Sequence, residues 1–206
     1  DYAVAYKYII EEVAYTWFNR LIAVRFMEVN DYLPSHMRAL SSESGKTEPD
    51  IVTNPFDAEL NLTSAEEEKI IALKRDNKLD EAFRMLFIKQ CNALNEILPA
   101  LFEKTSDYTE LLFNLSVIDQ DGVVYHLVHD IPEEDLKEAI DEAYKGRFEI
   151  LEKGAFLELY HGPTSAFKDV ALLFLPQIMK KAKKVLAIND EITILTATSG
   201  DTGKAA

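Results

Sequence analysis

The chain has 206 residues and a formal net charge of −14 at pH 7, with 48% hydrophobic and 28% charged residues. This length allows one or two domains with a sizeable core. Residues 1–130 contain 23 of the 36 acidic residues and 12 of the 22 basic residues. An acidic surface repels the phosphate backbone of nucleic acids. The acidic charge therefore argues against residues 1–130 binding DNA on their own.

The sequence predicts neither a membrane span nor a secretory leader. The longest apolar run, residues 170–179, contains Pro176 and is far shorter than the roughly 20 residues that a membrane helix needs. The N-terminus lacks a basic region followed by an apolar stretch, although a chain that begins at Asp1 can have lost its true start. The single cysteine, Cys91, excludes an internal disulfide, so we expect a cytoplasmic location and no membrane partner.

The first predicted element is a long helix over residues 5–29. Its apolar residues fall on one face that we expect to lie in the core: Tyr8, Ile9, Val13, Trp17, Leu21, Val24 and Met27. The Asn-Asp-Tyr-Leu-Pro-Ser run at 30–35 ends this helix, and residues 41–62 predict a long loop. A Ser-x-x-Glu capping box at Ser64 then predicts a charged helix that ends near residues 76–77.

A second long helix is predicted over residues 79–98. Its packing residues repeat at four-residue spacing: Phe83, Phe87 and Cys91. An Asp-Gln-Asp-Gly turn joins a short element at 111–118 to a predicted strand at 123–128. Pro132 near the start, acidic residues in the first turn and Gly146 after the last turn then define a further helix.

The last third of the chain carries most of the chemistry. An apolar strand that includes residues 157–160 ends at a Gly-Pro turn, a Thr-Ser pair caps a new helix, and Lys168 lies in its first turn. A second strand over residues 192–197 runs into a Ser-Gly-Asp-Thr-Gly loop, residues 199–203. Strand, helix, strand and loop predict a parallel unit whose loops gather at one edge of a sheet, where such folds bind ligands.

Three other patterns are rejected. His126 and His129 with Asp130 would need further convergent ligands to bind zinc, and at strand spacing the two histidines point to opposite faces, so we expect no metal. The Asn-Pro-Phe run at 54–56 lacks the second proline of the methyltransferase tetrapeptide that clamps the target base. Lys204 does not end a Walker loop, because alanine follows it where magnesium binding needs Ser or Thr.

Two runs in the last third match a known family along their whole length. They are residues 161–169, His-Gly-Pro-Thr-Ser-Ala-Phe-Lys-Asp, and residues 198–206, Thr-Ser-Gly-Asp-Thr-Gly-Lys-Ala-Ala. The first resembles the lysine motif, and the second the substrate loop, of threonine synthase, a fold type II enzyme that uses pyridoxal phosphate. The resemblance covers about residues 132–206.

This resemblance implies a cofactor and a set of site residues. Lys168 would form a Schiff base with pyridoxal phosphate, whose ring is the electron sink, and the freed amine could shuttle protons. His161 would touch the cofactor, or would only fix the turn by hydrogen bonding. The substrate carboxylate would lie at a helix N-terminus, held by Ser199, Gly200, Asp201, Thr202 and Gly203. The structural alternatives are a solvated helix lysine and an ordinary strand-to-helix turn.

The implied reaction converts O-phosphohomoserine and water to threonine and phosphate. The family's phosphate cradle, the partner of the pyridine nitrogen and most of the sheet would lie beyond Ala206. We therefore expect an incomplete fragment with little or no turnover.

A second resemblance belongs to the first part of the chain. Residues 13–30 and 90–99 carry it, and it extends over about residues 4–130. They resemble the helical N-terminal region of the adenine-specific DNA methyltransferases of BREX phage-defence systems. This resemblance implies S-adenosylmethionine as cofactor and DNA as partner, but the chain contains no glycine-rich S-adenosylmethionine loop. The alternative function is thus a methyltransferase N-terminal region that lacks its catalytic core.

The expected fold class is mixed. A mainly α-helical part, residues 1–131, precedes the truncated start of an α/β fold type II pyridoxal phosphate domain, residues 132–206. Two unrelated families that meet near Pro132 suggest a fused or misassembled reading frame. A third hypothesis is an acidic interaction module that has kept an inactive lysine motif.

Overall fold

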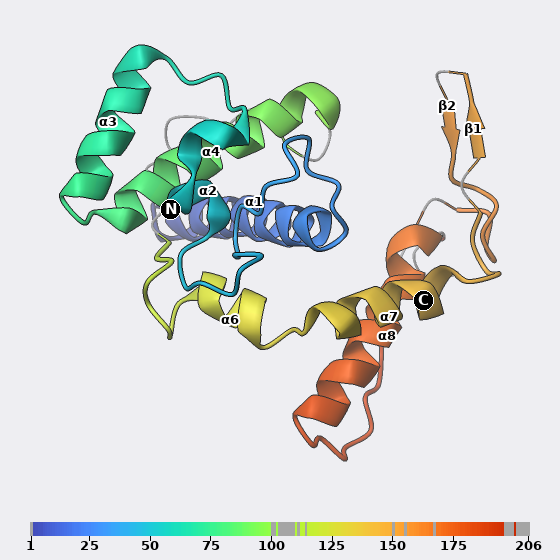
Figure 1. Cartoon of the computed structure of the whole chain (residues 1–206). Coiled ribbons are helices and arrows are strands. Elements are labelled where there is room, and N and C mark those ends of the chain that lie inside the picture. The colour runs from blue at the N-terminus through green and yellow to red at the C-terminus, as the bar shows by residue number, and fades with distance from the viewer. Residues whose placement is uncertain are drawn as a thin grey trace. The chain divides into compact units, whose positions relative to one another are not determined.

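The computed structural model describes residues 2–99, 102, 110, 112–113, 115–149, 151–154, 156–166, 168–195 and 200. These residues are mostly helical and form two compact units, residues 1–131 and 132–206 (Figure 1). The mainly helical first part is confirmed. In the described part of the second unit, the sheet is a single two-stranded hairpin.

Helix α1 spans Tyr2–Val29 and confirms the first predicted helix. Its buried apolar residues begin at Val13 and continue along one face: Val13, Trp17, Leu21, Val24 and Val29. Tyr8 and Ile9, which we expected in the core, are 66% and 42% exposed. The core face was therefore predicted correctly only for the second half of the helix, where the other elements of the unit pack against it.

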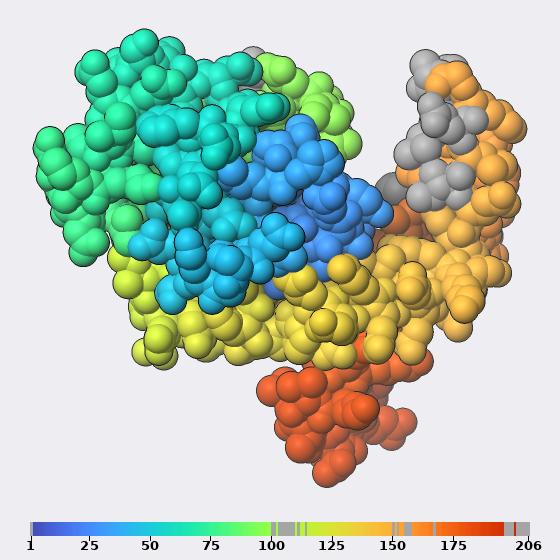
Figure 2. Space-filling model, viewed as in Figure 1, coloured from blue at the N-terminus to red at the C-terminus, as the bar shows by residue number. Residues whose placement is uncertain are grey.

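The predicted loop at 41–62 contains two short helices, α2 (Asp50–Thr53) and η1 (Pro55–Ala58). It belongs to a longer connection that starts at Asn30 and lies over α1 in Figures 1 and 2. The connection is anchored by buried apolar side chains: Leu33, Ala39, Leu40, Ile51, Val52, Ala58 and Leu60. These side chains explain why so polar a segment is ordered.

Helices α3 (Ser64–Arg75) and α4 (Leu79–Ile97) pack against each other and confirm two predicted helices. The capping box is formed by Thr63 and Glu66, one residue earlier than predicted. The hydrogen bond from Lys89, together with that from the Thr63 backbone, lowers the pKa of the Glu66 carboxyl to about 2. Glu66 therefore holds the start of α3 and ties it to α4.

Aromatic side chains stack in the centre of the first unit. The Trp17 and Phe113 rings lie 3.9 Å apart between centroids, and Phe87 lies 5.6 Å from Phe113 and 5.4 Å from Phe83. Phe83 and Phe87 are fully buried, and Cys91 is 2% exposed. The prediction that these three residues are packing residues is confirmed.

The segment predicted as a strand at 123–128 is a helix, α6 (Val123–His129). Val124 and Leu127, three residues apart, point into the core, which is the spacing of a helix face. The β-branched valines favoured a strand, but the packing of this face outweighs their weak preference.

A buried polar network fixes the connection to α1. Arg25 Nη1 lies 2.8 Å from Glu28 Oε1, and the side chains of this ion pair are 4% and 0% exposed. The other Glu28 oxygen accepts the backbone N–H groups of Ala39 and Leu40 at 2.9 and 2.8 Å. Ser41 Oγ donates to Glu28 at 2.9 Å. The carboxylate is thus satisfied by both charge and hydrogen bonds, as a buried charge requires.

In the second unit, helix α7 (Glu133–Tyr144) confirms the predicted helix and packs against α8 (Asp169–Val185). Strands β1 (Leu151–Lys153) and β2 (Phe156–Glu158) pair antiparallel, with Glu152 opposite Leu157. Residues 192–195 of the second predicted strand are not in a strand, and residues 196–197 lie outside the described residues, so the predicted parallel unit is not confirmed. Gly154, with φ of 63°, forms the tight turn between β1 and β2.

Candidate functional site

Lys168 stands at the N-terminus of α8. It is the cap residue of this helix, one position before the first turn in which we expected it, and its side chain is half-buried. Its carbonyl accepts the N–H groups of Ala171 and Leu172 at 3.1 and 3.0 Å. The predicted Thr-Ser cap is wrong, because Thr164 and Ser165 lie in the turn that precedes the lysine.

A buried carboxylate braces this turn. Asp169, the first residue of α8, is 2% exposed. Its Oδ2 accepts the Thr164 N–H at 2.9 Å, and its Oδ1 accepts the Thr164 hydroxyl at 2.6 Å. A Cβ at Gly162 would lie 2.5 Å from Asp169 Oδ2 and 2.7 Å from the Phe148 ring. The close approach at Gly162 and the two hydrogen bonds from Thr164 together fix the backbone on the N-terminal side of Lys168.

His161 contacts a carboxylate in the described structure. Its Nε2 lies 2.8 Å from Glu158 Oε2, and Lys153 Nζ lies 2.9 Å from the other oxygen. The His161 hydrogen bond, and then that of Lys153, lowers the pKa of the Glu158 carboxyl below its usual range. The hydrogen bond with Glu158 raises the pKa of the Tyr160 hydroxyl. His161 therefore ties the end of β2 to the Gly-Pro turn, and its contact with a cofactor stays a prediction.

The predicted substrate loop is largely outside the described residues. Of its members, Ser199, Asp201, Thr202 and Gly203 are outside, and Gly200 is described. Gly200 has φ of 145°, a conformation that favours glycine. The structure therefore leaves the role of this loop as a prediction.

The two histidines of the rejected metal pattern lie on α6 rather than on a strand. His126 Nδ1 lies 2.8 Å from Asp130 Oδ2, and His129 Nδ1 lies 2.9 Å from the Tyr125 carbonyl. Within the part of the chain that the structure describes, no group of three potential ligands could hold a metal ion.

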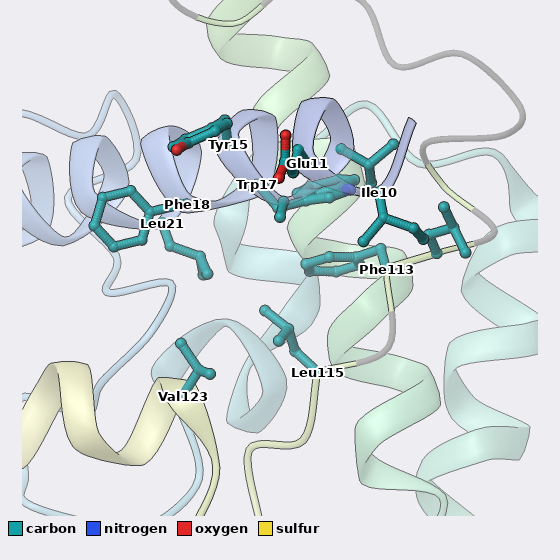
Figure 3. Close-up of a pocket in the computed structure, with 12 residues that line it drawn as sticks. Ile10, Glu11, Tyr15, Trp17, Phe18, Leu21, Phe113, Leu115 and Val123 are labelled. Atoms are coloured by element: carbon teal, nitrogen blue, oxygen red, sulfur yellow. The ribbon is translucent and has the colours of Figure 1, made fainter. Parts of the chain in front are cut away.

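The first unit contains an apolar groove that the sequence did not predict; its cavity volume is about 690 Å³. One wall is a stripe of α1: Ile10, Val13, Ala14, Trp17, Phe18 and Leu21. The other wall is Leu112, Phe113, Leu115 and Val123. Figure 3 shows Leu21 pointing toward Val123 across the opening, with Phe113 against Trp17. We call this site the α1 groove; the sequence signal for it is the set of apolar α1 residues, such as Ile10 and Phe18, that lie outside the predicted core face.

Comparison with known proteins supports both predicted resemblances. No protein-family profile matches the chain. The chain is 50% identical over 149 residues to the adenine-specific methyltransferase PglX of Lacticaseibacillus casei, which covers 69% of the chain and 12% of the relative. It is 34% identical over 149 residues to the adenine-specific methyltransferase BrxX of Escherichia coli O9:H4, a match that covers 72% of the chain and 12% of the relative. It is 39% identical over 83 residues to the threonine synthase of Buchnera aphidicola subsp. Acyrthosiphon pisum, a match that covers 38% of the chain and 19% of the relative.

The chain thus resembles both an adenine-specific methyltransferase and threonine synthase, as the sequence predicted. It spans about an eighth of the methyltransferases and about a fifth of the threonine synthase that it matches. The shares of the chain covered by PglX and by threonine synthase together exceed its length, so these two matches overlap in part. The methyltransferase match is the longer one, whereas a shorter match to the threonine synthase of Buchnera aphidicola subsp. Baizongia pistaciae is 57% identical over 51 residues.

Among the helices that the structure describes, none is both long and apolar enough to cross a membrane.

Proposed function

We propose that the first unit, residues 1–131, is the helical N-terminal segment of an adenine-specific DNA methyltransferase of a BREX phage-defence system. The observation that carries this proposal is the 50% identity to PglX over 69% of the chain. A match of that length has to include at least about half of the first unit, because residues 132–206 are little more than a third of the chain. DNA and S-adenosylmethionine are the partner and cofactor of the whole protein under this proposal.

Within such a methyltransferase the first unit acts as a scaffold and carries no methyl-transfer chemistry. Asn54 caps η1, Pro55 and Phe56 are its first residues, and Phe56 is 49% exposed beside Ile71 and Lys74. The Lys74 amine donates to the carbonyls of Val52 and Thr53 at 2.6 and 2.8 Å, which holds this corner to α3. The Lys74 amine is therefore engaged in folding.

A segment exchange tests the scaffold role. The matching segment of PglX from L. casei is replaced by residues 1–131 of this chain, and adenine methylation of DNA is measured. We expect the chimera to methylate adenine, because equivalent scaffolds place the rest of the enzyme in the same way. A chimera that also carries Phe87→Ala, which opens the core, is the matched control and should lose activity. A folded chimera without methylation would contradict the proposal.

A second candidate function concerns the second unit, for which we propose pyridoxal phosphate binding at Lys168. The observation that favours it is the turn braced by Asp169, which presents a half-buried lysine at a helix N-terminus. When bound, this cofactor supplies an electron sink for amino-acid substrates. Lys168 fits the group as its covalent attachment point, since a lysine amine is the chemistry that the aldehyde requires.

The remaining predicted roles belong to the same proposal. His161 contacts the cofactor or orders the turn, and the loop at residues 199–203 holds the substrate carboxylate. The proposed substrate of the whole enzyme is O-phosphohomoserine, with threonine and phosphate as products. The α/β fold type II architecture of residues 132–206 is likewise part of this proposal.

Reductive labelling tests the second candidate. The chain is incubated with pyridoxal phosphate, reduced with borohydride and mapped by peptide mass. We expect selective labelling of Lys168, with Lys180, an exposed lysine of the same helix, as the internal comparison. Asp169→Asn should reduce the selectivity, because it weakens the brace at Thr164. Uniform labelling of surface lysines would contradict cofactor binding at this site, whatever the segment exchange shows.

A further inference from the structure

A histidine and a carboxylate form a partly buried pair at the end of β2. His161 Nε2 lies 2.8 Å from Glu158 Oε2, and the two side chains are 29% and 15% exposed. Lys153 Nζ lies 2.9 Å from the other oxygen of the carboxylate. The hydrogen bonds of His161 and then Lys153 lower the pKa of the Glu158 carboxyl, so this group is ionised at neutral pH. An ionised carboxylate accepts hydrogen bonds and donates none.

The chemistry of this pair selects one tautomer of the imidazole. Because the Glu158 carboxylate only accepts, Nε2 of His161 must carry the hydrogen atom of the contact. In a neutral imidazole the second nitrogen, Nδ1, then keeps its lone pair and is a hydrogen-bond acceptor. Among the described residues, the hydrogen bond that His161 makes is the one at Nε2. The pair therefore leaves Nδ1 as the acceptor of this ring.

The other three histidines of the chain are held in the opposite way. His36, His126 and His129 each use Nδ1 to contact a carboxylate or a backbone carbonyl, at 2.9, 2.8 and 2.9 Å. These partners are acceptors, so in each case Nδ1 carries the hydrogen atom. His161 is thus the histidine that presents Nδ1 as an acceptor, and it lies in the turn before Lys168.

The His161 ring is also held close to the start of α8. Gly162, the next residue, packs so tightly on Asp169 that a Cβ there would lie 2.5 Å from Asp169 Oδ2. Asp169 follows Lys168 directly in the sequence. The side chain of His161 is thus held by Glu158, and its backbone is held next to the residue that follows Lys168.

We propose that Glu158 is a positioning residue of the Lys168 site: it holds His161 in the tautomer with hydrogen on Nε2, so that Nδ1 accepts a proton from the Lys168 ammonium. The transfer, direct or through one water, leaves a neutral amine on Lys168 and an imidazolium paired with Glu158. The neutral amine is the form that bonds to an aldehyde carbon. This inference rests on the proposed pyridoxal phosphate binding at Lys168.

The tautomer is measured first, on the chain alone. The histidine rings are labelled with nitrogen-15 and observed by nuclear magnetic resonance at about pH 8.5, where an ordinary imidazole is neutral. We expect hydrogen on Nε2 of His161 and on Nδ1 of His126 and His129. Glu158→Gln should give a mixture of both His161 tautomers, since a carboxamide both donates and accepts. Lys153→Gln, which removes another partner of the same carboxylate, is the matched control and should leave the tautomer unchanged.

The proton transfer is measured as a rate. The full chain is mixed with pyridoxal phosphate at about pH 7, and the bond to Lys168 is trapped with borohydride at successive times and quantified by peptide mass. We expect His161→Gln and Glu158→Gln each to slow this reaction by at least about tenfold. The final extent of labelling should not change, because a proton acceptor changes a rate and leaves the equilibrium as it was. The double variant should be no slower than His161→Gln, since Glu158 acts through the histidine.

Three results would overturn the inference. One is a native chain in which His161 carries hydrogen on Nδ1 or populates both tautomers. Another is an unchanged rate in Glu158→Gln, and the third is equal slowing by Lys153→Gln, with circular dichroism checking that each variant keeps its helices. Labelling that never selects Lys168 would instead overturn the proposed cofactor binding, and the tautomer would still decide whether Glu158 positions the histidine.

Discussion

The two units are stabilised in different ways. Among the described residues of 1–131, a cluster of 22 buried apolar residues connects the helices and the long connection. Among the described residues of 132–206, the buried side chains are Ala139, Ala143, Asp169 and Gln177. Hydrophobic stabilisation grows with the apolar area removed from water. The first unit is therefore stabilised mainly by its core, and the second mainly by local hydrogen bonds and ion pairs.

This difference shows that a local motif can keep its geometry without a large core around it. The brace from Asp169 to Thr164 spans five residues, and the His161–Glu158 contact spans three. Lys181 adds a contact between residues distant in sequence, since it joins α8 to α7 by contacts of 3.1 Å with Asp135 and 2.8 Å with Glu138. Substitutions should thus act globally in the first unit and locally in the second.

The largest effect is expected from Phe87→Ala in the first unit. Phe87 is fully buried between Trp17, Phe83 and Phe113, so its removal leaves a cavity. We expect the free energy of unfolding to fall by about 3–5 kcal/mol in a urea titration followed by Trp17 fluorescence. Leu175→Ala, at a 49% exposed position of α8, should change the helical circular dichroism transition by less than about 0.5 kcal/mol. Similar losses in both variants would contradict the comparison.

Glu28→Gln should lower the free energy of unfolding by about 3 kcal/mol, because it removes the negative charge that lies 2.8 Å from the buried Arg25 guanidinium. The same urea titration measures it. The double variant with Arg25→Met is the control: its cost should be smaller than the sum of the two single costs, since the groups share one network. Strict additivity would show that the network does not act as a unit.

Asp169→Ala should lower the free energy of unfolding of the second unit by about 1–2 kcal/mol, because it removes two hydrogen bonds from Thr164. The first unit should keep its stability. Hydrogen exchange of the Thr164 amide is the measurement, and we expect faster exchange there with unchanged exchange in α4. Asp190→Ala, at an exposed position beyond α8, is the matched control. Faster exchange in both units would indicate a core role for Asp169.

A pH titration of Glu158 should separate the two units further. His161, and then Lys153, lowers the pKa of this carboxyl, so its stabilisation is present above the ordinary carboxyl pKa and is lost as the pH falls through the lower folded value. Nuclear magnetic resonance of the Glu158 side chain measures the midpoint. We expect His161→Ala to raise it, while Trp17 fluorescence stays constant in the first unit. An unchanged midpoint would show that His161 does not stabilise the carboxylate.

The smallest effect is expected at Cys91. Burial raises the pKa of its thiol to about 12, so almost no thiolate forms at neutral pH. We expect no alkylation by iodoacetamide in the folded chain and full alkylation in urea, measured by mass spectrometry. Rapid labelling of the folded chain would mean that the core opens locally around α4.

Periodicity and caps predicted most helices of both units. Helices α4 and α7 have a strong 3.6-residue pattern or clear end signals, and both were predicted. Helix α1 was also predicted, although its apolar residues do not mark a single face over its whole length. Helix α6 was not, since Val123 and Val124 favour a strand locally while Val124 and Leu127 are fixed by tertiary packing. The capping box was shifted because Thr63 and Ser64 both precede a glutamate by three residues.

The candidate sites were predicted less completely than the helices. The motif placed Lys168 near the start of a helix, but the partners that fix its turn were not predicted. The Asp169 brace depends on a backbone turn that brings Thr164 back toward the helix, which spacing alone does not reveal. The α1 groove was missed for a related reason: apolar spacing predicts a buried face, but not which part of that face the other elements leave open.

The hydrogen bond between Arg25 Nη2 and the Val128 carbonyl, at 3.4 Å, also has a consequence for synthesis of the chain on the ribosome. Its two partners are 103 residues apart in sequence. At about 5–20 residues per second, the acceptor emerges roughly 5–20 s after the arginine. During that interval Glu28, three residues away, can already pair with Arg25, and the nascent first unit completes its core only when α6 has left the exit tunnel.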